Sequence, residues 1–419
     1  MEESTAPIVG IVAEYNPLHN GHLLMLEAVR SRLGDIPCVV ALSSNFTQRG
    51  EPALCDKWTR AEMALQCGAD LVLELPFLFS CAAAPDFSAG AVDLLARTHL
   101  ATHIAFGMEN PETDIDPILN ILLHEPPAFK QRLQEEMRRG ASYPKAMAET
   151  LDTFLPGAGP FASSPNNLLA ISYLLRVRRQ GYPLSLLPLP RVGAGHAEKA
   201  LGPLASAGAI RGALRQGTPL DDNSPLAAAM PGFSLRLLRE TEKKGRLCLS
   251  SEKLWPLLQA LFLHSAPGEL RRVDGMDEGI ENLFLKHWRD ATSLDDFVGC
   301  CISARYTQGH IRRRLIRLLL GVDRWTAQAV QRSGVPYARV LGFSARGREL
   351  LKTQGRTSEL PIITRLSAAK GTMGKSAAQM EFRASALYEL LLPCPDIQHE
   401  ERALPVIFNT ESFRVCGPI

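Results

Sequence analysis

The sequence lacks a strong excess of charge of either sign, and it lacks paired cysteines. Its 46 Lys and Arg side chains nearly balance its 44 Asp and Glu side chains, so the formal net charge is +2. This balance excludes a uniformly basic nucleic-acid-binding coat, although a local basic face is compatible with it. The nine cysteines are scattered without a Cys-x-x-Cys pair, which indicates reduced thiols rather than a zinc site or a disulfide framework.

Long apolar runs and export signals are also missing. No segment approaches the length of apolar chain that spans a bilayer. Residues 1–7 contain two glutamates and no basic residue, which argues against a secretory signal. The sequence therefore predicts a cytoplasmic protein with no membrane partner, and it makes no prediction of oligomeric state.

The first half of the chain alternates short apolar runs with amphipathic stretches. The apolar runs are at residues 8–13, 38–42, 71–75, 103–106 and 184–189. Predicted helices begin near Gly21, Asp56, Asp86 and Pro165. Such alternation is typical of βαβ units and a parallel sheet. We therefore predict a Rossmann-like α/β domain over residues 1–217, with a helical insertion at about residues 111–155.

The second half has a different pattern. Apolar residues recur at helical spacing in residues 251–264, 277–288, 293–302, 306–320 and 323–332, and short strands are predicted at 338–341 and 361–364. Because 419 residues exceed the size of one ordinary core, we predict a separate, mainly α-helical C-terminal domain over residues 218–419.

A His-x-Gly-His motif joins the first predicted strand to the first predicted helix. His19 and His22 lie three residues apart at the helix start, and Gly21 allows a ligand to approach the backbone closely. A helix N-terminus offers free N–H groups and the positive end of the helix dipole, and imidazoles can donate further hydrogen bonds to an anion. Capping or packing is the ordinary interpretation of so short a motif, but its position here favours phosphate binding. We predict that His19 and His22 are catalytic.

A second motif follows the last strand of the α/β region. Ser206 stands at the start of a predicted helix, and Arg211 lies about one turn later. Together they offer hydroxyl, backbone and guanidinium donors to the β- and γ-phosphates of a nucleotide. The two motifs predict a nucleotidyltransferase domain. Transfer at an α-phosphate needs positioning and charge neutralisation rather than a covalent nucleophile, which agrees with the lack of a convincing Gly-x-Ser-x-Gly or Cys/His arrangement.

Across almost its full length the sequence resembles the bacterial tRNA(Met) cytidine acetate ligases, which are enzymes of the nucleotidyltransferase superfamily. The resemblance rests on ordered motifs at residues 10–22 (GIVAEYNPLHNGH), 45–52 (NFTQRGEP), 68–76 (GADLVLELP), 106–109 (FGME), 164–167 (SPNN), 191–194 (RVGA), 305–307 (RYT) and 340–343 (VLGF). Such an ordered set is far more specific than His-x-Gly-His alone.

The resemblance implies an ATP pocket. Its implied members are Val12, Ala13, Glu14, Tyr15, Asn16, Pro17, Leu18, His19, Asn20, Gly21, His22, Leu23, Leu24, Met25, Gly107, Asn166 and Arg191, beside Ser206 and Arg211. It also implies a two-step reaction without acetyl-CoA. Acetate attacks the α-phosphate of ATP to give acetyl-adenylate, and the N4 amine of the wobble cytidine of elongator tRNA(Met) then takes the acetyl group. Mg²⁺ is expected with the nucleotide, although no carboxylate cluster identifies a ligand.

The sequence departs from the family pattern at two positions. Gly208 stands where the helix-start motif usually has threonine, which removes a hydroxyl donor to phosphate. Ala304 stands where a lysine usually precedes Arg305, which removes a charge from a region expected to face RNA. We expect altered rather than abolished activity.

Two further sites are hypotheses. Arg49 lies in a polar loop after the second strand, where the carboxyl ends of parallel strands form a ligand crevice, and it is a candidate contact for the acceptor or for acetate. An internal ion pair with Glu51 is the equal alternative. A basic run is the RNA candidate, with a solvated helix face as its alternative, and its members are Arg305, Tyr306, His310, Arg312, Arg313, Arg314 and Arg317.

Two other functions stay open on the sequence. One is a small-molecule adenylyltransferase or cytidylyltransferase, which would use the same phosphate motifs without needing the long helical second half. The other is a non-catalytic tRNA-binding protein with a degenerate nucleotide site.

Overall fold

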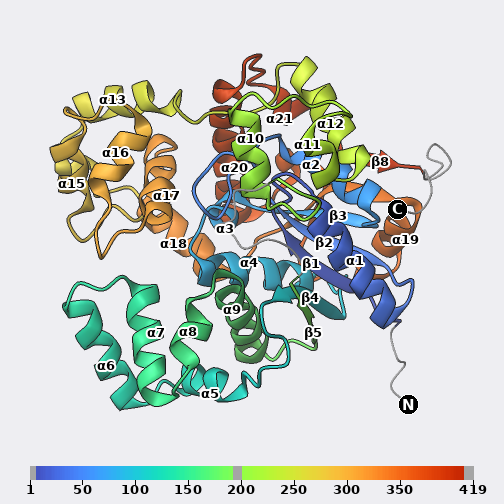
Figure 1. Cartoon of the computed structure of the whole chain (residues 1–419), viewed down its shortest axis with the longest axis horizontal. Coiled ribbons are helices and arrows are strands. Elements are labelled where there is room, and N and C mark those ends of the chain that lie inside the picture. Colours follow the sequence, from blue (N-terminus) through green and yellow to red (C-terminus); the bar gives the residue numbers. More distant parts are fainter. Residues whose placement is uncertain (1–5, 192–200, 410–419) are drawn as a thin grey trace.

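The computed structural model describes residues 6–191 and 201–409, and its centre is a mixed sheet of eight strands (Figure 1). The strand order is β5–β4–β1–β2–β3–β6–β7, and β8 pairs with β6. The strands are β1 (Val9–Ala13), β2 (Cys38–Ser43), β3 (Leu71–Leu75), β4 (His103–Met108), β5 (Ser185–Pro190), β6 (Ala338–Ser344), β7 (Ile362–Ile363) and β8 (Val406–Phe408).

The first five strands are parallel, as the alternating pattern predicts. Ile11 of β1 lies opposite Val40 of β2 on one side and Ala105 of β4 on the other. The side chains of β2 and β3 are buried along their whole length, as expected of a parallel sheet covered on both faces. The chain leaves β3 and returns on the other side of β1 as β4. This change of direction places a ligand crevice beyond the carboxyl ends of β1 and β4.

The helices of the first half begin and end at the signals seen in the sequence. The Asp56 carboxylate accepts a hydrogen bond from the backbone of Thr59 and caps its helix, and Ser206 caps another by accepting from Ala209. These helices are α1 (Asn20–Leu33), α2 (Lys57–Cys67), α3 (Phe77–Ser80), α4 (Ala84–Arg97), α5 (Asp116–His124), α6 (Pro127–Arg138), α7 (Tyr143–Phe154), α8 (Ala158–Ser163), α9 (Pro165–Gln180) and α10 (Ala207–Arg215).

The predicted insertion is helical. Helices α5, α6 and α7 occupy residues 116–154 without a strand among them, and with α8 they form a lobe at one side of the sheet (Figure 1).

The second half supplies a further set of helices. Among them α13, α15 and α16 form a second lobe around an aromatic cluster in which Phe297 lies 5.1 Å from Trp255 and 5.6 Å from Phe262 between ring centroids (Figure 1). The helices are α11 (Pro225–Ala229), α12 (Gly232–Lys243), α13 (Leu254–His264), α14 (Pro267–Leu270), α15 (Ile280–His287), α16 (Leu294–Cys301), α17 (Gln308–Leu319), α18 (Arg324–Ser333), α19 (Ala345–Lys352), α20 (Gly371–Leu391) and α21 (His399–Arg402), with short 3₁₀ helices at Gln354–Thr357 and Leu366–Ala368.

The second half also returns to the sheet. β6 runs antiparallel to β3, with Val340 opposite Leu73, and β7 and β8 both pair with β6. The sequence predicts strands near β6 and β7 but places them in a mainly helical domain beyond residue 217. The sheet therefore takes strands from both sides of that position.

A buried ionic cluster joins the two halves. Lys57 of α2 bonds to Glu74 of β3, to Glu381 of α20 at 2.8 Å and to Glu400 of α21 at 3.0 Å. Arg339 of β6 bonds to Glu74 at 3.1 Å and also to Glu400. All five side chains are almost completely buried. We call these five residues the ionic cluster.

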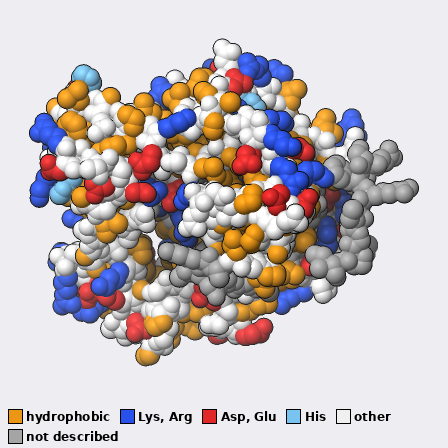
Figure 2. Space-filling view, turned by 45° about the horizontal axis from the view of Figure 1, so that its top comes forward, with side chains coloured by type: hydrophobic (Ala, Val, Ile, Leu, Met, Phe, Trp, Pro, Cys, Tyr) orange, Lys and Arg blue, Asp and Glu red, His pale blue; other side chains and the backbone are white. Residues whose placement is uncertain are grey.

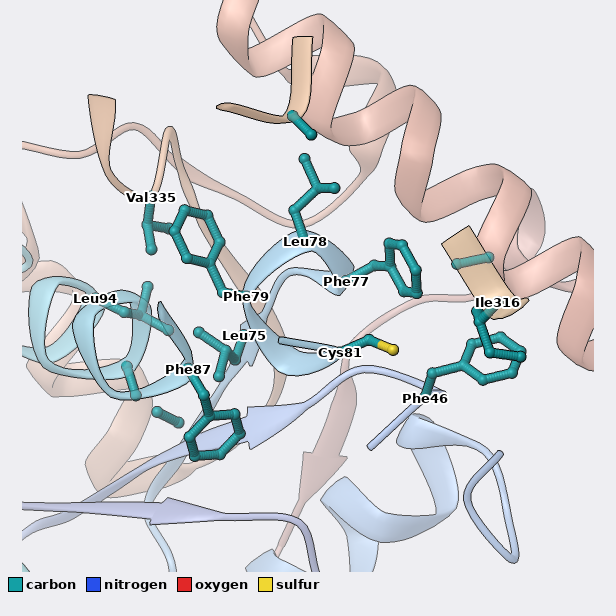
Figure 3. Packing of buried hydrophobic residues seen from close by; sticks show 14 of the residues in the cluster. Phe46, Leu75, Phe77, Leu78, Phe79, Cys81, Phe87, Leu94, Ile316 and Val335 are labelled. Atoms are coloured by element: carbon teal, nitrogen blue, oxygen red, sulfur yellow. The ribbon is translucent and has the colours of Figure 1, made fainter. Parts of the chain in front are cut away.

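Apolar packing reinforces this connection. Phe46, after β2, and Ile316, on α17, belong to one buried cluster that also contains Phe77 and Leu78 of α3 (Figure 3). Helix α17 is therefore packed on the α/β core rather than standing apart in the helical lobe.

Two observations concern the absences noted in the sequence. Within residues 6–191 and 201–409, no helix is both long and apolar enough to cross a bilayer. The eight cysteines in those ranges are free thiols, whereas Cys416 and residues 1–5 lie outside the described residues.

Candidate active site

A cavity of about 460 Å³ opens at the predicted crevice. Its walls are the ends of β1, β4 and β5, the loop after β2, and the first turns of α1, α4, α9 and α10. The two sequence motifs that predict phosphate binding therefore meet in one place, although nearly two hundred residues separate them.

His19 and His22 are held by backbone hydrogen bonds in one defined tautomer. The N–H of Gly21 donates to Nδ1 of His19 at 3.1 Å, and the N–H of His19 donates to Nδ1 of His22 at 3.1 Å. A neutral imidazole has one acceptor and one donor nitrogen, so each proton is on Nε2. The rings lie 3.9 Å apart between centroids and line the cavity. The capping role considered from the sequence is therefore real, and it leaves both Nε2–H groups as donors.

The surroundings keep both imidazoles neutral. Burial, with a smaller effect of Arg191, lowers the pKa of His19 to about 4. Burial, His19 and Arg191 together lower the pKa of His22 well below its ordinary value. At neutral pH both imidazoles are therefore uncharged hydrogen-bond donors. A bound polyphosphate would raise their pKa values and favour the protonated form.

Arg211 reaches the cavity from α10. Its Nη1 donates to the backbone oxygen of Asn16 at 2.7 Å, and its Nη2 lies 3.7 Å from the Glu51 carboxylate. Its Nε is buried and has no hydrogen-bond partner among the described residues. A buried donor without a partner is costly, so this Nε–H is suited to an anionic ligand.

Ser206 and Gly208 line the cavity at the start of α10. The Ser206 hydroxyl accepts the capping hydrogen bond from Ala209 at 3.2 Å. A Cβ added at Gly208 would lie 3.6 Å from the Ser206 Oγ, which is an ordinary contact. The position therefore has room for the threonine that the family pattern has, and glycine here leaves space beside Ser206.

Three predicted pocket residues come from other elements. Asn166, in the first turn of α9, donates to Glu109 at 3.3 Å, and the Arg191 backbone extends the pairing of β5 by donating to Met108 at 3.0 Å. Burial lowers the pKa of Arg191. A Cβ built at Gly107 would meet nothing within 4 Å, so glycine leaves the end of β4 open to the cavity. The neighbouring residues 192–194, part of the same sequence motif, lie outside the described residues.

Four members of the implied ATP segment do not line the cavity. Leu18 is fully buried and Leu23 packs against the same apolar cluster, while Pro17 is buried in the turn. Asn20 donates to the backbone oxygens of Pro203 and Ala228 at 2.9 and 2.8 Å. These side chains hold the turn in place.

The loop after β2 contributes residues that the sequence indicated only in part. Arg49 lines the cavity, as do Thr47 and Gln48. The alternative of an Arg49–Glu51 ion pair is not seen, because Glu51 pairs with Arg211 at 3.7 Å and with Arg312 at 3.3 Å. Sequence reasoning missed an aromatic side of the cavity formed by Phe87, Phe106 and Tyr173, since apolar residues in an α/β domain ordinarily indicate core.

The basic run on α17 requires a correction. Arg317 is 4% exposed and pairs with Asp274, and the Arg312 side chain is 12% exposed. Arg313 donates to the Gln48 backbone oxygen at 2.9 Å, and Gly50 packs so closely that a Cβ would meet the Arg313 nitrogen at 2.4 Å. The prediction of an RNA-facing surface is therefore wrong for the buried Arg317. Arg312, Arg313 and Arg314 are half-buried, because this helix face packs against the loop after β2, and for them RNA contact stays a prediction.

Of the seven residues in the basic run, Arg305 is exposed, and it precedes α17. Arg305 is about half exposed, pairs with Glu278 at 3.0 Å and stands next to the exposed Ala304. On the face shown in Figure 2, basic and acidic side chains are interspersed, in agreement with the balanced composition.

A protein-held metal ion does not fit the cavity. Within the described residues, no group of three or more His, Cys, Asp or Glu side chains is arranged to hold one. Glu14 is the only carboxylate among the described residues that line the cavity.

Comparisons with known proteins give a consistent result. A family model described as HIGH nucleotidyl transferase matches residues 6–403. The tRNA(Met) cytidine acetate ligase of Syntrophomonas wolfei is 35% identical over 400 residues, which cover 93% of this chain and 95% of that protein. The protein of the same name from Clostridium perfringens is 33% identical over 414 residues, covering 96% and 100%. The structure of Thermotoga maritima TmcAL bound with alpha-thio ATP matches with a TM-score of 0.87 at 28% identity, covering 96% of this chain and 100% of that one.

Proposed function

Since the chain belongs to the tRNA(Met) cytidine acetate ligases of the HIGH nucleotidyl transferase family, we propose that it is an ATP-dependent ligase that acetylates N4 of the wobble cytidine of elongator tRNA(Met). The observation that carries this proposal is the convergence of donors in one cavity at the carboxyl ends of the parallel strands. His19, His22, Arg191 and Arg211 all line it, and the substrates of the first step are both anions.

In the first step an acetate oxygen attacks the α-phosphorus of ATP, and the bond to the bridging oxygen breaks with release of pyrophosphate. We assign the Nε2–H donors of His19 and His22 to the phosphates and the donors of Ser206 and Arg211 to the leaving pyrophosphate. Preorganised donors of this kind stabilise the developing charge without moving during the reaction. Gly107, Asn166 and Arg191 complete the nucleotide pocket.

Arg49 is the proposed contact of acetate. It is an exposed cation on the cavity wall, and among the described residues no ion pair joins it to a carboxylate. A guanidinium can bind a carboxylate through two parallel hydrogen bonds. We expect Arg49→Ala to raise the KM for acetate more than the KM for ATP, and steady-state kinetics with each substrate varied in turn would show the difference.

In the second step the N4 amine attacks the acetyl carbon of acetyl-adenylate, and AMP leaves. Mg²⁺ is proposed only as the companion of the ATP phosphates, since the described part of the lining offers a single carboxylate, and no step is assigned to it. Contacts with tRNA are not expected from the buried Arg317 of α17.

The test is acetylation of RNA by the purified protein. It is incubated with ATP, magnesium, labelled acetate and total bacterial tRNA, and the digested RNA is examined for N4-acetylcytidine by mass spectrometry. We expect acetate-dependent acetylcytidine that is lost in His22→Ala. ATP cleavage without a modified base would favour a small-molecule acceptor, and no nucleotide turnover at all would favour a binding protein.

A further inference from the structure

The feature of interest is the Glu14 carboxylate, which lines a cavity whose other charged side chains, among the described residues, are arginines. Among the described lining residues, Glu14 is the only acid, and the basic side chains are three arginines and two histidines. Acetate, pyrophosphate and the phosphates of ATP are anions that a carboxylate repels, whereas the ribose hydroxyls and the adenine amine of ATP can donate hydrogen bonds to it. The only substrate group that donates hydrogen bonds and must lose a proton is the N4 amine of cytidine.

Glu14 is held in place rather than free to turn away. One oxygen, Oε1, accepts a hydrogen bond from the Gln48 backbone at 2.8 Å. The Glu14 backbone oxygen accepts from the buried Arg60 at 2.8 Å. The next residue, Tyr15, has a φ of 45°, so the chain turns sharply just after Glu14. Among the described residues, no hydrogen bond joins the other oxygen, Oε2, to the protein, so it can accept one from a ligand in the cavity.

The aromatic side chains line the same cavity as this carboxylate. Burial, together with the Glu14 charge, raises the pKa of the Tyr173 phenol. The Tyr173 ring lies 6.0 Å from that of Phe106 between centroids, and Phe87 lines the same cavity. Unstacked bases in RNA are ordinarily bound against aromatic rings with their edges hydrogen-bonded. A cytosine bound against these rings would lie in the same cavity as Glu14.

We infer that Glu14 binds the acceptor amine and accepts its proton. This inference rests on the proposed function. The carboxylate accepts a hydrogen bond from the cytidine N4–H. As the N4 lone pair forms the bond to the acetyl carbon, the bond from that carbon to the AMP oxygen breaks and AMP leaves with the electron pair. The proton from N4 passes to Glu14 and then to solvent. The lone pair of this amine is delocalised into the base, so removal of its proton during attack accelerates the step.

The test separates the two half-reactions in Glu14→Gln. Glutamine can accept the same hydrogen bond from Gln48, so the substitution removes the charge and the proton acceptor while keeping the anchor. Acetate-dependent ATP–pyrophosphate exchange without tRNA reports the first step, and single-turnover transfer from preformed acetyl-adenylate to tRNA reports the second. We expect transfer to fall by about 100-fold or more while exchange changes far less.

Two further variants make the outcome decisive. Glu109→Gln removes a carboxylate that contacts Asn166 but does not line the cavity, and it should change both half-reactions in parallel. If Glu14→Gln proves unfolded by circular dichroism, Glu14→Asp is used, and transfer should again fall more than exchange. Equal losses in both half-reactions, unaltered transfer, or rescue of both by added magnesium would overturn the inference. A wild-type protein without acetate-dependent exchange would overturn the proposed function itself.

Discussion

The two neutral imidazoles make the stability of the free protein depend on pH. Unfolded histidine titrates near pH 6.5, whereas the folded pKa of His19 is about 4 and that of His22 is also strongly lowered. Between these values the unfolded chain binds more protons than the folded chain. The contribution of the two neutral imidazoles to the free energy of unfolding is therefore present above about pH 6.5 and is lost as the pH falls towards the folded pKa.

Urea unfolding can measure this contribution. We expect the free energy of unfolding to drop between about pH 7 and pH 4.5, and to drop less in a double variant, His19→Asn with His22→Asn. The variant is the control for carboxylates that titrate in the same window. Equal losses in the two proteins would mean that the imidazoles are not held neutral.

Gly107 provides a substitution that separates binding from folding. Because a Cβ there enters open space, Gly107→Val should leave the free energy of unfolding within about 0.5 kcal/mol of wild type. The new methyl groups would occupy part of the nucleotide pocket, so the KM for ATP should rise about tenfold. Thermal unfolding measures the stability and steady-state kinetics measure the KM for ATP. An unchanged KM would show that Gly107 does not contact the nucleotide.

At this scale the sequence indicates polar site residues well and apolar ones poorly. His19, His22 and Arg211 lie on the cavity wall, and a motif at a strand-to-helix junction is enough to suggest them. The sequence does not predict Tyr173 as a site residue, because an aromatic residue at helical spacing is equally typical of the hydrophobic core. Asn20 was grouped with the ATP pocket because a linear motif does not show which side chains turn inwards.

At the scale of elements, α17 supports the loop after β2. Arg313→Ala removes the hydrogen bond to Gln48 and leaves space beneath the loop, so it should destabilise the protein by about 1–3 kcal/mol and lower the acetylation rate. The salt dependence of tRNA affinity should stay as in wild type, since Arg313 is half-buried and its guanidinium is bonded to the protein backbone rather than to RNA. Filter binding at several salt concentrations tests this, with the half-exposed Arg305→Ala as the comparison. A reduced salt slope in Arg313→Ala alone would contradict the structural role.

The ionic cluster gives a second prediction for elements. Lys57→Met leaves three buried carboxylates with one cation, so we expect a loss of about 3–5 kcal/mol in the free energy of unfolding. Lys130→Met removes an exposed lysine 3.6 Å from Glu125 and should cost at most about 1 kcal/mol. Denaturant titrations of both variants measure the difference. Similar small losses would show that the cluster contributes little net stability.

Elements with a strong local pattern could be predicted, and those defined by their neighbours could not. β1 to β5 are short and mostly apolar, and α9 has Pro165 in its first turn. Helix α20 was missed because it is buried on most sides and carries Glu381 and Glu389 inside, so it has no clear polar face. The arginines of α17 were assigned to RNA because charge in a sequence does not reveal what a helix packs against.

At the scale of the whole molecule, the predicted division into two domains between residues 217 and 218 stays a prediction. Because both parts contribute strands to one sheet, we do not expect the first part to fold independently. Without β6, the buried apolar edge of β3 would be open to pairing with other chains. We expect a 1–217 fragment expressed alone to aggregate, and co-expression with residues 218–419 to recover a soluble complex. Size-exclusion chromatography distinguishes the cases. A monomeric, cooperatively unfolding 1–217 fragment would favour two independent domains.

The same pairing affects how the protein is made. β3 ends at Leu75 and its partner β6 begins at Ala338, so more than 260 residues must leave the ribosome after β3 before its edge can be covered. At the usual rate of synthesis this takes roughly 13 to 50 seconds. For that time the nascent sheet presents an apolar strand without its neighbour, and a ribosome-associated chaperone is the natural occupant of that edge.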